Sequence, residues 1–174
     1  PDQIDGFETL VRGLPGVAAV DRAPMLRASI TEVNGVRAEE AKVTADAQWA
    51  LRGDRGLTYT ASLPAQNTIV AGDWWPADYA GPPQISFDAK LAEGMSLTVG
   101  DTLTFNVMGR PITASIANLR EIDWSGMGMN FSVIFAPGTL EHAPHTYLAT
   151  VRVDQEHEAG VDRAVGRDYP NVTS

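Results

Sequence analysis

The chain has 174 residues, a formal net charge of −9 and no cysteine. The hydrophobic content of 44% and the charged content of 20% are ordinary for a folded chain of one domain or two small subdomains. The acidic balance argues against nucleic acid as a partner, because phosphates require a basic surface, and against electrostatic docking on anionic lipid. The lack of cysteine excludes disulfides, thiolate metal sites and a cysteine nucleophile.

No apolar run approaches the roughly 20 residues that a membrane-spanning helix needs. The chain starts at Pro1 without a methionine, and no charged segment followed by an apolar one indicates a signal peptide. We therefore expect an excised domain of a longer protein.

The first segment of the chain predicts a helix. Asp5 and Glu8 have the spacing of a capping box, and apolar residues at helical spacing continue as far as Leu14. The Pro-Gly dipeptide at 15–16 then ends the helix.

Extended segments follow this helix. We expect strands at 17–20 and 25–33, and the Asn-Gly dipeptide at 34–35 predicts a tight hairpin turn after the second strand. Two further strands, 49–51 and 57–61, are predicted to pair across a turn.

The middle of the chain predicts a compact β-rich unit. A strand at 85–87 leads to Asp88, which is placed to cap a short helix that ends at Gly94. Apolar and polar residues then alternate over 103–107 and over 112–116, with a glycine-containing link between the two runs. This pattern predicts a hairpin with one buried face.

The last part of the chain is predicted to return to the first. We expect an apolar strand at 131–135, a connection, and a strand at 146–153. Asp154 is placed to cap a helix over 155–167, and residues 171–174 have the pattern of a further strand.

Five motifs together carry a resemblance to a known family: WALRGDRGLTY at 49–59, GDWWP at 72–76, VGD at 99–101, IANLRE at 116–121 and APH at 143–145. With them, the chain resembles the extracytoplasmic domain of MacB/FtsX-type ABC transporter permeases. It is most similar to the branch named for a link to lysophospholipase biosynthesis. The likeness covers roughly residues 49–153 and is specific only when the motifs are taken together.

The resemblance implies an α+β fold with two subdomains. A discontinuous porter-like α/β subdomain would comprise residues 1–63 and 141–174, and an inserted β-rich subdomain would comprise residues 64–140, as in the MacB-like periplasmic domain. Such a domain lies between the first and second transmembrane helices, on the periplasmic face of the bacterial inner membrane.

The resemblance also implies a mechanical function without catalysis. The chain contains no phosphate-binding Gly-x-x-x-x-Gly-Lys-Ser/Thr motif, so ATP hydrolysis would belong to a separate cytoplasmic ABC ATPase subunit. The domain would transmit conformational change within a permease homodimer, and act on a lipid-like substrate or a periplasmic esterase or lysophospholipase-like partner. The alternative is a stand-alone periplasmic binding module for a hydrophobic ligand.

Aromatic and methionine residues in two segments are the candidate contact sites for a partner or ligand. Trp74 and Trp75 are adjacent and would point to opposite faces of an extended segment, so at most one of them would belong to the core. The competing interpretation packs both under the Pro-Pro loop at 82–83. The six candidates are Trp74, Trp75, Tyr79, Trp124, Met127 and Met129.

Residue types that support catalysis are sparse in this chain. Glu141, His142 and His145 could in principle hold zinc and serve an enzyme, but Pro144 prevents a helix from aligning them. The Ser125 segment lacks the Gly-x-Ser-x-Gly pattern of a hydrolase nucleophile. We therefore predict no catalytic residue, metal ligand or cofactor, and metal analysis would test the histidine alternative.

Overall fold

The computed structural model describes residues 3–125 and 129–173. The chain divides into two compact units, Met25–Pro144 and a discontinuous one made of Pro1–Pro24 and His145–Ser174. The helices are α1 (Ile4–Arg12), α2 (Ala89–Gly94) and α3 (Glu158–Asp168), with short 3-10 helices η1 (Ala38–Glu40) and η2 (Gln48–Leu51). The strands are β1 (Val17–Val33), β2 (Val36–Arg37), β3 (Arg55–Tyr59), β4 (Asn67–Gly72), β5 (Gln84–Asp88), β6 (Thr102–Val107), β7 (Arg110–Ile122), β8 (Val133–Phe135) and β9 (Thr146–Val153).

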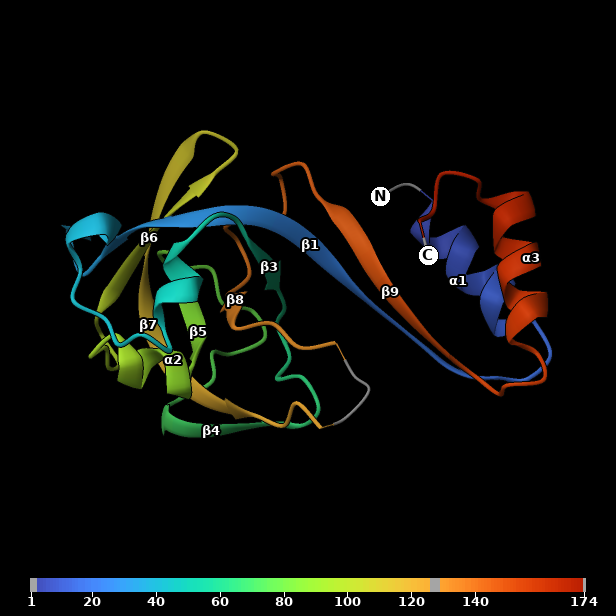
Figure 1. Cartoon of the computed structure of the whole chain (residues 1–174), viewed down its shortest axis with the longest axis horizontal. Coiled ribbons are helices and arrows are strands. Elements are labelled where there is room, and N and C mark those ends of the chain that lie inside the picture. Colours follow the sequence, from blue (N-terminus) through green and yellow to red (C-terminus); the bar gives the residue numbers. More distant parts are fainter. Residues whose placement is uncertain (1–2, 126–128, 174) are drawn as a thin grey trace. The chain divides into compact units, whose positions relative to one another are not determined.

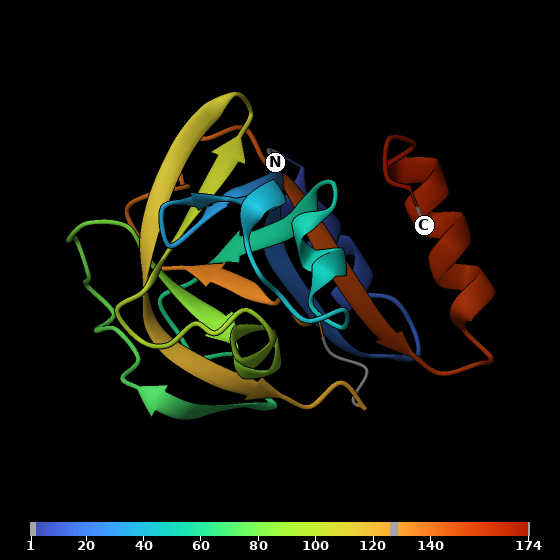
Figure 2. The ribbon, with the colours of Figure 1, turned by 60° about the vertical axis from the view of Figure 1, so that its left-hand side comes forward.

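Six strands of the unit Met25–Pro144 pair in a closed ring, in the order β1–β3–β8–β5–β7–β6 and back to β1. Two neighbouring pairs, β3 with β8 and β5 with β7, are parallel, and the other four are antiparallel. β4 adds to β7, and β2 adds to β1. Figure 2 shows α2 end-on, with β7 curving past it. The protein is therefore a mixed α/β chain with one large mixed sheet.

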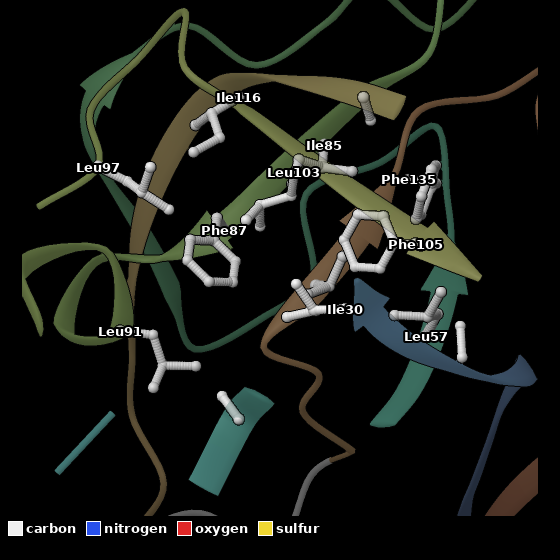
Figure 3. Close-up of a cluster of buried hydrophobic side chains, with 14 of the residues drawn as sticks. Ile30, Leu57, Ile85, Phe87, Leu91, Leu97, Leu103, Phe105, Ile116 and Phe135 are labelled. Carbon is white, nitrogen blue, oxygen red and sulfur yellow. The ribbon is translucent and has the colours of Figure 1, made fainter. Parts of the chain in front are cut away.

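The inside of this ring is the main hydrophobic core (Figure 3). Phe87, Phe105 and Phe135 are completely buried, and the Phe105 and Phe135 rings meet edge to face with centroids 5.3 Å apart. A small closed sheet has an interior that side chains from alternate positions can fill. Leu103, Phe105 and Val107 are the inward set of β6, as their alternation in the sequence predicts.

Local signals in the middle of the chain form the predicted structures. The Asp88 carboxylate accepts a hydrogen bond from the Lys90 backbone N–H at 2.9 Å, which caps α2. Asn34 and Gly35 have φ values of 53° and 79°, as a two-residue hairpin turn requires. These findings confirm the cap, the short helix and the Asn-Gly turn.

Three predictions about the first part of the chain are wrong. The two expected strands are one continuous β1, because it pairs with β9 along one part and with β3 and β6 along the other. The expected strand 49–51 lies in η2, because Ala50 and the N-cap residue Ala47 are both buried at the three-residue spacing of a 3-10 turn. The capping box does not form, because α1 begins at Ile4 with Gln3 at its N-cap.

The smaller unit packs α1 and α3 against the paired strands β1 and β9 (Figure 1). Phe7 and Val11 of α1 are buried, and the Phe7 ring meets Tyr169 edge to face at 5.7 Å. The final helix begins three residues later than predicted, although the Asp154 carboxylate does accept a hydrogen bond from the N–H of His157. Residues 171–173 do not form the predicted strand.

The boundaries of the two units differ from the subdomain limits expected from the resemblance. Residues 25–63 were expected in the discontinuous subdomain, whereas they lie in the unit Met25–Pro144. The reason is that β1 and β3 supply Ile30 and Leu57 to the core inside the ring. The chain crosses between the units after Pro24 and after Pro144.

Candidate functional site

Trp74 and Trp75 follow β4 and lie against each other. Their ring centroids are 4.2 Å apart and their planes differ by 33°. The indole N–H of Trp74 donates to the Ala61 carbonyl at 2.9 Å, and that of Trp75 donates to the Thr60 carbonyl at 3.0 Å. Trp75 is only 4% exposed and packs with Ile134. Both rings are thus fixed against the segment that follows β3.

The expectation that the two rings would face opposite ways is wrong, although only Trp75 is buried and Trp74 is partly buried. That rule holds for strands, and β4 ends at Gly72, so the tryptophans lie in an irregular segment. Gly72 has a φ of 72°, and a Cβ there would approach the Ala117 carbonyl oxygen to 2.3 Å. Tyr79 packs at the edge of the same cluster and its hydroxyl donates to the Pro82 carbonyl.

A buried polar network lies beside this segment. The Arg120 side chain is fully buried on β7 and makes five hydrogen bonds. Its acceptors are Ser86 Oγ, Asn67 Oδ1 and the backbone carbonyls of Ser86, Phe131 and Ser132. The guanidinium group therefore joins β4, β5 and the segment that leads into β8.

Asn118 extends this network to the tryptophans. It accepts a hydrogen bond from the Ser86 hydroxyl at 2.5 Å, and its amide N–H donates to the Asp73 carbonyl at 3.1 Å. Burial lowers the pKa of Arg120 to about 10, although the nearby Asp88 carboxylate acts in the opposite direction. Arg120 therefore remains charged at neutral pH. Its hydrogen bonds indicate a structural role, since each of the three guanidinium nitrogens donates to at least one acceptor of the protein.

Sequence reasoning missed this network, although a signal was present. Asn118 and Arg120 lie in phase with the inward-facing Ile116 and Ile122 of β7. Polar residues at inward positions of a strand predict a buried hydrogen-bonded cluster, because an unpaired buried charge would be costly.

The second predicted contact segment lies elsewhere in the unit. Trp124, just after β7, is 54% exposed and borders a pocket together with Trp49. Met129 is half-buried, and the prediction for Met127 falls outside the described residues. The structure thus places Trp74, Trp75 and Tyr79 in one packed cluster and Trp124 at a different pocket.

The histidine segment does not form a metal centre in the described part of the chain. Glu141 Oε2 accepts a hydrogen bond from the backbone N–H of Gly138 at 2.7 Å. The rings of His145 and Tyr147 meet edge to face, with their centroids 5.4 Å apart. Among residues 3–125 and 129–173, no three His, Cys, Asp or Glu side chains are grouped so that they could hold a metal ion.

Within the same described ranges, no helix has the length and apolar character needed to cross a membrane.

No family model matches the chain. A crystal structure of a domain assigned to a permease protein from Porphyromonas gingivalis is 17% identical, with a TM-score of 0.46, and the alignment covers 92% of this chain and 74% of that one.

One curated relative matches most of the chain. The protein named "Uncharacterized ABC transporter permease YbbP" from Escherichia coli (strain K12) is 30% identical over 151 residues, or 86% of this chain. The chain spans 17% of the length of that relative. The resemblance to ABC transporter permeases predicted from the sequence is confirmed by this match. The chain is therefore similar to one segment of an ABC transporter permease.

Proposed function

We propose that this chain is a non-catalytic domain of an ABC transporter permease subunit, located on the periplasmic side of the bacterial inner membrane. It changes conformation when a separate cytoplasmic ATPase subunit binds and hydrolyses ATP. The observation that carries this proposal is the 30% identity to an ABC transporter permease over 86% of the chain.

The construction of the unit Met25–Pro144 supports a mechanical role. A closed ring of strands with a filled interior resists deformation, because packed cores have few voids to collapse into. The Arg120 hydrogen bonds add cross-links between β4, β5 and the segment before β8. Such a body moves as a whole, so it can pass a displacement from membrane helices to a lipid-like substrate or a periplasmic partner.

We further propose that the two units are the two subdomains of the family. The discontinuous unit would be the porter-like one, and the unit Met25–Pro144 the inserted one, with its limits as the structure gives them. In a permease homodimer, nucleotide binding would then move one unit relative to the other.

The periplasmic location can be tested by thiol labelling in cells. The chain has no cysteine, so one introduced cysteine is a unique label within it. In the full permease, made free of other accessible cysteines, Met108→Cys lies at a hairpin position that is 65% exposed. It should react with a membrane-impermeant maleimide in intact spheroplasts. Its neighbour Val107→Cys, at a position 2% exposed, is the unreactive control. Reaction of Met108→Cys only after lysis would contradict the proposal.

Coupling to ATP can be tested by distance measurements between spin labels in the permease with its ATPase. One pair spans the two units, Met108→Cys with Arg163→Cys, and a control pair lies within one unit, Met108→Cys with Val70→Cys. We expect ATP to change the first distance distribution and to leave the second unchanged. If ATP changes neither distribution, the domain does not transmit the signal.

One observation favours the alternative, a binding module for a hydrophobic ligand. In the smaller unit, a pocket of about 380 Å³ has a mainly apolar lining that includes Phe7, Val151 and Val165. A hydrophobic ligand retained through purification, and detected by mass spectrometry of an organic extract, would support this function. A ligand-free chain that also fails to take up added lipid would exclude it.

A further inference from the structure

Two exposed tryptophans border one pocket of the unit Met25–Pro144. The pocket has a volume of about 590 Å³, within the usual range for small-molecule sites. Trp49 is 46% exposed and Trp124 is 54% exposed, although they come from segments 75 positions apart in the sequence. Exposed aromatic rings that border a cavity are typical of a contact site, since they leave a large apolar surface in contact with water.

The side chain of Arg55 holds the ring of Trp49 in place. The Arg55 guanidinium carbon lies 4.9 Å from the centre of the ring, and its Nη2 donates to the Trp49 carbonyl at 2.7 Å. One face of the ring therefore already carries a cation. A fixed ring loses little freedom when a ligand binds, which favours affinity.

The charged groups around the pocket are mainly acidic. The lining includes three carboxylates, Asp46, Asp88 and Glu93, and one cationic side chain, Lys90. Arg55 on the Trp49 ring and Arg120 near Asp88 offset part of this negative charge. Asp88 is only 7% exposed and cannot turn away, because its carboxylate caps α2. The formal net charge of −9 on the whole chain adds to this local field.

Part of the pocket lining is apolar. Ala47 and Leu91 are buried and belong to the same lining as the acidic residues. An ammonium group with alkyl substituents suits this combination: its charge is attracted to ring faces and carboxylates, and its alkyl groups cover Ala47 and Leu91. A bare metal ion suits it poorly, since ring faces supply no coordinating oxygen.

We propose that the Trp49–Trp124 pocket binds a small organic cation with an alkylated ammonium head. The carboxylates of Asp46, Asp88 and Glu93 attract the cation, and the two indole rings enclose its alkyl groups. This binding site is independent of the mechanical function proposed above, because it depends only on residues of the unit Met25–Pro144.

The test is a titration of the whole chain followed by the indole N–H signals in heteronuclear NMR. The four tryptophans give four signals, assigned with single Trp→Phe variants. Choline chloride should shift the signals of Trp49 and Trp124 in a saturable manner. The signals of Trp74 and Trp75, whose N–H groups are bonded to carbonyls, are internal controls in the same spectrum and should not move.

Two reference ligands separate the possible sources of a shift. Sodium chloride at equal ionic strength reports general screening. The neutral carbon isostere of choline, with a tert-butyl group in place of the trimethylammonium group, reports apolar binding alone. Shifts that sodium chloride reproduces, or that the neutral isostere produces with equal affinity, would overturn the proposal. The absence of a saturable shift with choline would also overturn it.

Substitutions test which residues carry the affinity. Trp124→Ala should weaken choline binding by about 3- to 30-fold, the range that cation–π contacts supply. Asp46→Asn with Glu93→Gln should weaken it further while leaving binding of the neutral isostere unchanged. Glu39→Gln, an exposed substitution outside the pocket, is the matched control and should bind choline as the parent does. An unchanged affinity in the Asp46→Asn, Glu93→Gln chain would contradict the proposed role of the carboxylates.

Discussion

The four tryptophans form two pairs that the structure treats differently. Trp74 and Trp75 are adjacent in the sequence, stack on each other and donate both indole N–H groups to backbone carbonyls. Trp49 and Trp124 are distant in the sequence, are about half exposed and border a pocket. A tryptophan whose ring and N–H are both occupied stabilises the fold, whereas one with an exposed ring beside a cavity can meet a ligand.

This difference explains why adjacency in the sequence was a poor guide to contact residues. The Trp-Trp motif was expected to leave one ring exposed, because adjacent residues of an extended segment point to opposite faces, yet its irregular backbone places the two rings against each other. Substitutions at and around the two pairs show how sharply they are separated, through the change that each causes in the free energy of unfolding.

The largest effect is expected at the network that supports the first pair. Arg120→Met should lower the free energy of unfolding by about 4–5 kcal/mol, because it leaves several buried acceptors without a donor. Chemical denaturation followed by circular dichroism measures this. Arg110→Met, an exposed substitution on the same strand, is the control and should change little. Equal stability of the two variants would refute the structural role of Arg120.

Trp75→Ala is expected to be nearly as damaging. It should cost about 3–4 kcal/mol, because the side chain is 4% exposed and its removal leaves a cavity beside Ile134. The same denaturation experiment applies. A smaller loss of stability for Trp75→Ala than for Trp74→Ala would contradict the finding that Trp75 is the more deeply buried of the two.

Gly72→Ala probes the turn that brings the first pair inward. We expect a loss of about 2–3 kcal/mol, since the added Cβ would meet the Ala117 carbonyl at a positive φ. Gly100→Ala is a matched control, because its φ is 93° but no atom lies within 4 Å of the added Cβ. Both variants carry the backbone strain, but only Gly72→Ala carries the steric clash, so thermal unfolding of the two separates these effects. An equal loss of stability in both would show that the structure around Ala117 relieves the clash.

Trp74→Ala should have an intermediate effect. The ring is only partly buried, so we expect a loss of about 1–2 kcal/mol from its packing and its hydrogen bond to Ala61. Trp74→Phe keeps much of the ring but removes the N–H, so the difference between the two variants estimates the packing contribution. Identical losses would assign the whole effect to the hydrogen bond.

Trp124→Ala should have the smallest effect on stability. A half-exposed ring supports little of the fold, so the free energy of unfolding should change by less than about 0.5 kcal/mol. A loss as large as that of Trp75→Ala would place Trp124 with the structural pair.

Local signals in the sequence predicted part of this fold. The Asp88 cap, the Asn-Gly turn and the alternation in β6 depend on neighbouring residues, so their patterns could be interpreted without tertiary information. The closed ring could not be predicted in this way, because it depends on pairings such as β3 with β8, more than 70 positions apart. The Trp49–Trp124 pocket has the same origin: the expected strand at 49–51 is η2, and only the three-dimensional fold brings η2 and the end of β7 to one cavity.

The most direct test of the division between the two pairs is hydrogen exchange at the four indole N–H groups, followed by NMR after transfer of the protein to deuterated water. We predict slow exchange at Trp74 and Trp75, whose N–H groups are bonded to the carbonyls of Ala61 and Thr60, and fast exchange at Trp49 and Trp124. Equal exchange rates for all four, or protection of Trp49 and Trp124 alone, would contradict this assignment of roles.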